Sequence, residues 1–189
     1  MTKNNKNRIL VILSSPRKGN STYAAKKFAR SLKGKKTYTD INRLRVKPCT
    51  ACGKCSEGFI CVHNDDAAAL IKQAEEADVV IVAAPVYFTG VPAPLKAFID
   101  RNQSQWEKNM RFKFQSPKLK VKTGVIILTA GHSKAKHFRP AESEIRSYFA
   151  VNNIKTKLVM KFGNMDEKKA MKKYSAKIKA AAKIMRKNV

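Results

Sequence analysis

Residues 8–22, RILVILSSPRKGNST, set an almost wholly apolar run before a loop of serine, glycine and basic residues. The run at 8–13 lacks any alternation of polar and apolar residues, which is typical of a strand buried on both faces of a sheet. The next segment, YAAKKFARSL at 23–32, repeats its apolar residues at helical spacing. A buried strand, a loop of small residues and a helix in this order predict the start of a βαβ unit.

The same alternation continues along the chain. Further strands are predicted at 37–42, 78–84, 122–130 and 154–162, and helices are predicted from Asp65 or Asp66 and at 92–101, 138–151 and 166–188. Five strands linked by helices indicate an α/β fold with a parallel sheet in the doubly wound order 2-1-3-4-5 and helices on both faces. We expect residues 1–189 to form a single domain with a cysteine-rich loop at 48–64 and an irregular segment at 102–121. Asp100 and Arg101 are expected to pair or to cap a helix end.

The chain is strongly basic, with 40 Lys plus Arg against 13 Asp plus Glu and a formal net charge of +27. Such a charge makes a nucleic-acid-binding module one hypothesis. However, the lysines are spread along the whole chain, and no motif supports this hypothesis, so we do not expect nucleic acid as a partner. An acidic redox protein would fit the charge equally well. The longest apolar run, Val79–Phe88, is too short to span a bilayer, and we expect a cytoplasmic protein.

In a sheet of this order, a ligand binds at the carboxyl ends of strands 1, 3 and 4. After the first strand come hydroxyl side chains, two cations and a helix N-terminus, which together make a phosphate cradle. The alternative is a plain helix cap at Asn20 or Ser21. The chain contains neither G-x-x-x-x-G-K-[ST] nor G-x-G-x-x-G after a strand, which argues against a P-loop and a dinucleotide site. The loop therefore suits a monophosphate such as flavin mononucleotide (FMN).

The loops after the third and fourth predicted strands fit a flat aromatic ligand. APVYFTGVP at 84–92 combines two aromatic side chains with a rigid, proline-bounded backbone. TAGHS at 129–133 consists mainly of small residues that allow a ligand to approach closely, and it also contains His132. Three loops with suitable chemistry at the three expected strand ends are stronger evidence than any one loop.

These segments together resemble a known family. SSPRKGNST, PVYF with PAPLKAFIDR behind it, and the cysteine segment followed by two aspartates resemble the flavodoxin-like NAD(P)H-dependent FMN reductases, and more narrowly the iron–sulfur flavoproteins. The resemblance covers roughly residues 8–165. It implies that Ser15, Arg17, Asn20, Ser21 and Thr22 hold the FMN phosphate, and that Pro85, Val86, Tyr87, Phe88, Ala130 and Gly131 surround the ring. Lys18 is a second candidate cation at the phosphate, and His132 is a candidate hydrogen-bond partner of the flavin. The family usually has glycine at the position of Ser14.

All four cysteines, Cys49, Cys52, Cys55 and Cys61, follow the spacing C-x2-C-x2-C-x5-C. This spacing is close to the bacterial ferredoxin run, but its last gap is longer. The resemblance implies one [4Fe–4S] cluster, since three closely spaced thiolates can surround it while the fourth reaches across the longer gap. Zinc remains an alternative because four thiolates satisfy its tetrahedral geometry, and free or oxidised thiols are another.

The preferred functional hypothesis is a flavin-dependent oxidoreductase that transfers electrons between the cluster and FMN. In this fold we expect the cysteine loop after the second strand to lie far from the flavin of its own chain and to serve the flavin of a neighbouring subunit, in a homodimer or homotetramer. An acidic ferredoxin or NAD(P)H is the expected electron donor. The alternative is an NAD(P)H-dependent reductase of quinones, nitro compounds or free flavin without a cluster. The sequence contains no candidate nucleophile constellation, and we name no catalytic side chain.

Overall fold

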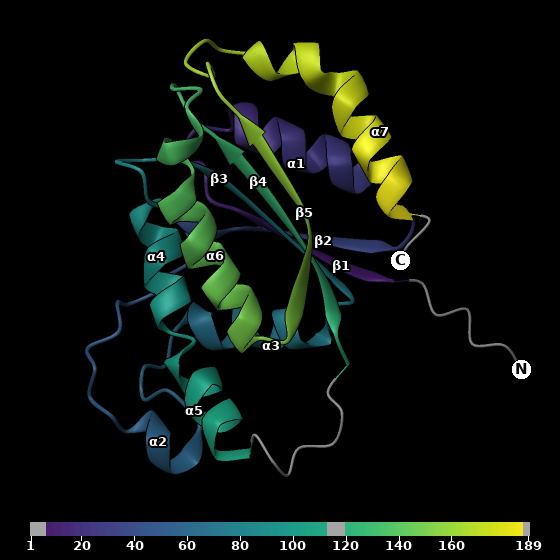
Figure 1. Cartoon of the computed structure of the whole chain (residues 1–189). Coiled ribbons are helices and arrows are strands. Elements are labelled where there is room, and N and C mark those ends of the chain that lie inside the picture. The colour runs from purple at the N-terminus through teal and green to yellow at the C-terminus, as the bar shows by residue number, and fades with distance from the viewer. Residues whose placement is uncertain (1–6, 113–119, 187–189) are drawn as a thin grey trace, which may run out of the picture.

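The computed structural model describes residues 7–112 and 120–186, and Figure 1 shows its arrangement. Its sheet has the order β2-β1-β3-β4-β5, and all neighbouring strands are parallel. The strands are β1 (Arg8–Leu13), β2 (Lys35–Asp40), β3 (Val79–Pro85), β4 (Lys122–Thr129) and β5 (Ile154–Phe162). The predicted fold class and strand order are therefore confirmed.

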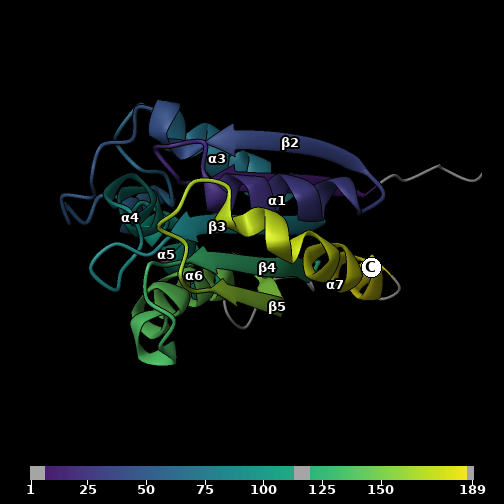
Figure 2. The ribbon, with the colours of Figure 1, turned by 90° about the horizontal axis from the view of Figure 1, so that it is seen from above.

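Helices cover both faces of the sheet, as Figures 1 and 2 show. α1 (Asn20–Arg30) and α7 (Ser175–Arg186) cover one face, and α3 (Asp66–Glu76), α4 (Ala93–Asp100) and α6 (Arg139–Val151) cover the other. The remaining helical elements are η1 (Ile41–Arg43), α2 (Cys55–Gly58), α5 (Gln103–Phe112), η2 (Ala135–His137) and η3 (Ala170–Tyr174). Among the described residues, no helix has the length and apolar character needed to span a membrane.

Two apolar cores lie on the two sides of the sheet because successive strand residues point to opposite faces. Val80 and Val82 of β3 pack with α3, α4 and α6, whereas Val79 and Ile81 pack with α1 and α7. All four side chains are fully buried. The continuous apolar runs of the sequence therefore correspond to strands covered on both faces.

The expectation of an irregular segment at 102–121 is wrong for its first part, because α5 occupies Gln103–Phe112. Its sequence, QSQWEKNMRF, buries little on the sheet: Ser104 is the one buried residue among those described in the helix. α5 contacts α2 and α6, and most of its residues are polar, so its sequence did not stand out as a core helix. Residues 113–119 lie outside the described residues. The predicted helix at 166–188 is also shorter, since α7 begins at Ser175 after η3.

We predict that Gly124→Ala destabilises the fold by about 1–3 kcal/mol through overpacking. A Cβ on Gly124 would lie 2.5 Å from the Phe149 ring and 2.8 Å from Ile154 Cγ2, between β4 and α6. Urea unfolding measures the change in the free energy of unfolding. Gly58→Ala is the matched control, because a Cβ there meets nothing within 4 Å; equal stability of the two variants would contradict the packing argument.

Candidate functional site

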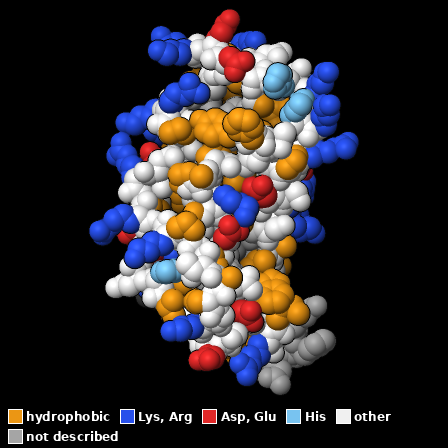
Figure 3. Space-filling view, turned by 90° about the vertical axis from the view of Figure 1, so that its left-hand side faces the viewer, with side chains coloured by type: hydrophobic (Ala, Val, Ile, Leu, Met, Phe, Trp, Pro, Cys, Tyr) orange, Lys and Arg blue, Asp and Glu red, His pale blue; other side chains and the backbone are white. Residues whose placement is uncertain are grey.

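A pocket of about 400 Å³ lies at the carboxyl ends of the central strands. It is bounded by the loop after β1, the end of β3 and the segment after β5. Seven residues singled out from the sequence line it: Ser15, Arg17, Lys18, Asn20, Ser21, Pro85 and Tyr87. On the face of the molecule shown in Figure 3, apolar side chains gather near the top and again near the bottom, and basic side chains surround them.

The loop after β1 presents the start of α1 to this pocket. Gly19 occupies the N-cap position, and no side chain caps the helix. The first N–H groups of a helix lack intrahelical partners, so this terminus favours an anion. Arg17 and Lys18 are exposed at the pocket, so they can add positive charge. Ser14 does not line the pocket, because its hydroxyl donates to the Ala83 carbonyl oxygen in β3 at 3.1 Å.

Asn20 holds the segment after β5 against α1. Its Nδ2 donates to the carbonyl oxygens of Met165 (3.0 Å) and Glu167 (2.9 Å), and its Oδ1 accepts from the Met171 N–H at 3.2 Å. The side-chain amide is therefore occupied by the protein itself. Asn20 shapes the pocket through this segment, which is a role that the sequence did not indicate.

The segment after β5 is the part of the pocket that sequence reasoning missed. It contributes Met165, Asp166, Glu167, Lys168, Lys169 and Lys172 to the lining. Asp166 also explains why a small residue is needed after β4, because a Cβ on Gly131 would lie 2.5 Å from the Asp166 carboxylate. These lysines belong to the basic charge that is spread along the whole chain, so nothing in their pattern pointed to a site.

Six remaining candidates, from α1 and from the loops after β3 and β4, do not line this pocket. Thr22, Val86, Phe88, Ala130, Gly131 and His132 are not among the residues that line it. Phe88 is fully exposed (104%) and has a left-handed backbone with φ 47°. His132 stacks against His137, with ring centroids 5.1 Å apart. Desolvation and then the charges of His132 and two lysines hold the pKa of His137 below its ordinary value.

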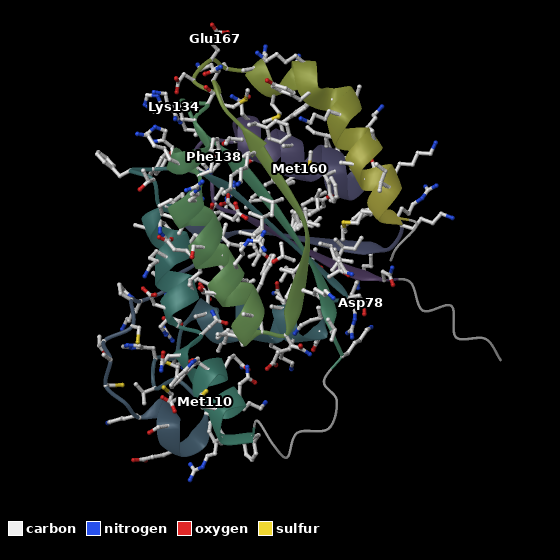
Figure 4. All side chains as sticks on the ribbon, in the orientation of Figure 1. Asp78, Met110, Lys134, Phe138, Met160 and Glu167 are labelled. Carbon is white, nitrogen blue, oxygen red and sulfur yellow. The ribbon has the colours of Figure 1, made fainter. Side chains whose placement is uncertain are left out.

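A second pocket, of about 320 Å³, contains all four cysteines. Cys49, Cys52, Cys55 and Cys61 line it together with His63, Arg101, Gln103, Ser104 and Glu107. The two pockets share no lining residue. In Figure 4, Glu167 of the first pocket lies at the opposite end of the molecule from Met110 of α5, the helix that contributes Gln103, Ser104 and Glu107 to the second pocket.

The second pocket depends on Arg101, which directly follows α4 and is 2% exposed. Its Nη1 donates to Asp65 Oδ2 at 2.6 Å and to the Lys47 carbonyl oxygen at 2.9 Å. Its Nη2 donates to the His63 carbonyl oxygen at 3.3 Å, and its Nε to Cys61 Sγ at 3.2 Å. One buried guanidinium therefore binds residues on both sides of the cysteine run.

Asp65 is the counter-charge of Arg101 and also the N-cap of α3. Its Oδ1 accepts from the Ala67 N–H at 3.1 Å, and its Oδ2 accepts from the Lys47 N–H at 2.9 Å. Burial opposes ionisation, but these hydrogen bonds and the one from Arg101 hold the pKa of the Asp65 carboxyl below its ordinary value. Asp65 and Cys61 in turn raise the pKa of Arg101 against the effect of burial. The predicted cap at this helix is confirmed.

All four thiols gather at this pocket, but they do not form a compact metal site. In the described parts of the chain, no three His, Cys, Asp or Glu side chains are close enough to hold one metal ion. Four thiolates are the ligand set of a [4Fe–4S] cluster and satisfy zinc equally well. Left-handed backbone at Ala51, Gly53 and Phe59 curls the chain around this pocket. Burial raises the pKa of the Cys55 thiol, which is the desolvation expected of a partly enclosed site.

His63 also lines the cysteine pocket. Its Nε2 is buried and has no hydrogen-bond partner within the ranges that the structure describes. A buried ring nitrogen without a partner is uncommon, and it is a further polar group available at this pocket.

Comparison with known proteins gives consistent results. The profile of a family described as NADPH-dependent FMN reductase matches residues 7–156. The chain is 37% identical over 110 residues to an iron–sulfur flavoprotein of Methanosarcina thermophila, covering 56% of this chain and 58% of that protein. It is 29% identical over 151 residues to an iron–sulfur flavoprotein of Methanocaldococcus jannaschii, covering 78% and 74%. The match thus spans little more than half the length of the first of these relatives.

Solved structures share the fold. An NAD(P)H:quinone oxidoreductase from Methanothermobacter marburgensis has a TM-score of 0.68 at 16% identity, with 95% of this chain and 97% of that chain covered. An FMN-dependent NADH-azoreductase from Bacillus anthracis, solved in complex with FMN, has a TM-score of 0.66 at 12% identity, with 95% and 100% covered. At these identities the likeness establishes the fold and no more.

We predict that Asp65→Asn destabilises the protein by about 3–5 kcal/mol at neutral pH, because it leaves the Arg101 charge buried without its partner. A carboxyl whose pKa is lowered by folding stabilises the fold above its unfolded-state pKa, which is about 3.9. This contribution is lost as the pH falls through the lower folded-state value. The difference in unfolding free energy between the wild type and Asp65→Asn should therefore be constant above about pH 5 and narrow at lower pH.

Urea unfolding at a series of pH values measures this difference. Asp100→Asn is the matched control, because Asp100 pairs with Lys96 at the surface and such pairs contribute about 0–1 kcal/mol. A difference in unfolding free energy between the wild type and Asp65→Asn that stays unchanged down to pH 2 would contradict the assigned role of the Asp65 carboxylate.

Proposed function

The chain belongs to the NADPH-dependent FMN reductase family, and from this premise we propose that it is a flavin-dependent oxidoreductase that transfers electrons between a [4Fe–4S] cluster and FMN. The observation that carries the proposal is the gathering of all four cysteines at one pocket, separate from the pocket at the carboxyl ends of the strands. The curated relatives named iron–sulfur flavoproteins support it.

In this proposal the first pocket holds FMN. The N-terminus of α1 would bind the phosphate, with the Ser21 hydroxyl and charge from Arg17 and Lys18. Ser15 and Thr22 would support this loop, because the Ser15 hydroxyl donates to the Arg17 carbonyl oxygen and Thr22 lies outside the lining. The ring would lie between two loops, at Pro85–Phe88 and Ala130–His132. Asn20 would act indirectly, by holding the segment after β5 in place. Bound FMN supplies the ability to exchange a hydride or single electrons.

The second pocket would hold the cluster through Cys49, Cys52, Cys55 and Cys61. A cluster bound there supplies transfer of one electron at a time. Cys55 and Cys61 are half-buried, whereas Cys49 and Cys52 are exposed. The exposed side of the pocket would therefore face a partner, and the Arg101 side would face the protein.

The separation of the two pockets supports an oligomer. α4 has eight residues and is therefore about 12 Å long. It lies between the β3 loop at the first pocket and Arg101 at the second pocket, so its length separates the two sites. Exposed apolar side chains occur in the cysteine segment, at Ile60 and Val62, and on α5, at Met110 and Phe112. Because α5 contacts α2 of that segment, we refer to these four residues as the apolar patch. We propose that this patch contacts a second copy of the chain in a homodimer or homotetramer, so that the cluster of one subunit serves the flavin of its neighbour. Phe88, exposed beside the first pocket, is a matching apolar contact on the second copy.

The electron donor would be NAD(P)H or an acidic ferredoxin. A net charge of +27 attracts an acidic protein over long range, and salt would slow that association. The second candidate function is an NAD(P)H-dependent reductase of quinones, nitro compounds or free flavin in which the cysteines hold no cluster. The exposure of Cys49 and Cys52 favours this alternative, as does the family description.

We predict that replacing all four cysteines by serine abolishes flavin reduction by a one-electron donor such as reduced ferredoxin, because the route through the cluster is lost. Reduction of FMN by NAD(P)H should change little, since hydride transfer needs only the first pocket. Anaerobic stopped-flow absorbance of the flavin measures both rates. Equal rates with ferredoxin for the wild type and the variant would contradict electron transfer through the cysteine site and favour the second candidate function.

We predict that Arg17→Ala weakens FMN binding about 10–100-fold, the effect of removing one hydrogen bond to a charged group. Fluorescence quenching of FMN measures the dissociation constant. Arg30→Ala is the matched control for net charge, because Arg30 lies in the last turn of α1, at the other end of that helix. A loss of affinity of the same size in both variants would mean that Arg17 acts only through overall charge.

We predict that Ile60→Glu weakens self-association, because it places a charge in the apolar patch beside the cysteines. Light scattering coupled to gel filtration measures the molar mass. Ile60 is 77% exposed, and Val121→Glu is the matched control, since Val121 is 60% exposed and precedes β4 away from both pockets. A wild-type protein that is monomeric at high concentration would overturn the proposed oligomer.

A further inference from the structure

Arg101 makes one contact that the architecture of the fold does not require. Asp65 neutralises its charge, with both side chains almost fully buried at 1% and 4% exposure. The carbonyl oxygens of Lys47 and His63 satisfy further N–H groups of the guanidinium. These contacts are sufficient to hold the cysteine segment against α4. Nevertheless, Nε donates to Cys61 Sγ at 3.2 Å.

This contact is weak for a thiol and strong for a thiolate. A neutral thiol sulfur is a poor acceptor, whereas a hydrogen bond between two charged groups is roughly twice as strong as a neutral one. The bond from Arg101 Nε therefore gains most when Cys61 carries negative charge, as it does when it ligates a metal. Burial increases the effect, because charge interactions weaken less in a site that excludes water.

The cysteine site is asymmetric in this respect. Cys61 accepts from a buried cation at 3.2 Å, whereas Cys49 accepts from the neutral backbone N–H of Ala51 at 3.5 Å. Because hydrogen bonds to sulfur and nearby charge set the reduction potentials of iron–sulfur clusters, the iron bound by Cys61 would differ electronically from the iron bound by Cys49.

We propose that Arg101 is a positioning residue for Cys61, and that its Nε–H bond stabilises the reduced state of the group that the cysteines hold. This inference rests on the proposed function. Reduction adds one electron from the donor to the cluster, without breaking a bond or taking up a proton. The added negative charge strengthens the hydrogen bond from the guanidinium. Arg101 therefore raises the reduction potential of the cluster. It also slows the release of the cluster from the protein.

The test compares Arg101→Lys with the wild type after anaerobic reconstitution with iron and sulfide. Lysine keeps the positive charge, but a single amine cannot replace the planar fork of donors. Iron release to a chelator should become about 10–100-fold faster, as for other groups that support a metal ligand. The midpoint potential of the cluster, followed by electron paramagnetic resonance, should shift to a more negative value.

Arg111→Lys is the matched control. Arg111 also contacts the cysteine segment, since its Nη1 donates to the Ser56 carbonyl oxygen at 3.3 Å and its guanidinium lies 5.9 Å from the Phe59 ring centroid. It makes no hydrogen bond to a sulfur among the described residues. The Arg111→Lys substitution should therefore leave the midpoint potential of the cluster unchanged. FMN affinity, measured on the separate pocket, reports whether each variant is folded.

A measurement on the wild type keeps the proposal testable if Arg101→Lys does not fold. With arginine labelled by ¹⁵N, pulsed electron paramagnetic resonance of the reduced cluster should detect a coupled arginine nitrogen. Its absence would overturn the proposal, as would an Arg101→Lys protein with unchanged potential and iron release. A wild type that takes up no iron would instead overturn the proposed function, and the role of Arg101 with it.

Discussion

The buried pair of Arg101 and Asp65 is the interaction on which the cysteine site depends. The segment that carries the thiols buries almost no apolar surface of its own, and α2 within it has no buried residue. Hydrophobic burial therefore does little to fix its position. Arg101 and Asp65 instead join the end of α4, the start of α3 and both sides of the cysteine run through hydrogen bonds. Since an unpaired buried charge is very unfavourable, the arrangement holds only while both partners are present.

The first pocket is built on a similar plan. Asn20, at the start of α1, reaches across to the segment after β5 just as Arg101, at the end of α4, reaches across to the cysteines. In both cases a polar side chain at a helix end holds a functional loop in place, although the segment after β5 also buries Met165 and Met171 in the core. The sheet provides the framework, and two polar side chains attach the functional loops to it. This arrangement allows the two sites to be positioned independently within one fold.

The strands and their order were predictable because they depend on local signals. Apolar runs mark β1, β3 and β4, and the alternation of strands and helices leaves few topologies open. The cysteine spacing likewise indicated which thiols gather at one pocket. The sequence favoured a local pair or helix cap for Arg101, but its partners lie 36 and 40 residues away. Asn20 and Met171 are 151 residues apart. Contacts at such separations leave no periodic pattern, so these two residues, α5 and the lysines after β5 required the structure.

The central claim is that one chain carries two redox groups at two separate pockets. The most direct measurement is to assay iron, acid-labile sulfide, zinc and flavin in a single anaerobically purified sample. The account predicts about four iron and four sulfide for each chain, together with FMN, and no stoichiometric zinc. FMN without iron, even after anaerobic reconstitution, would contradict it and leave a cluster-free flavin reductase as the better description.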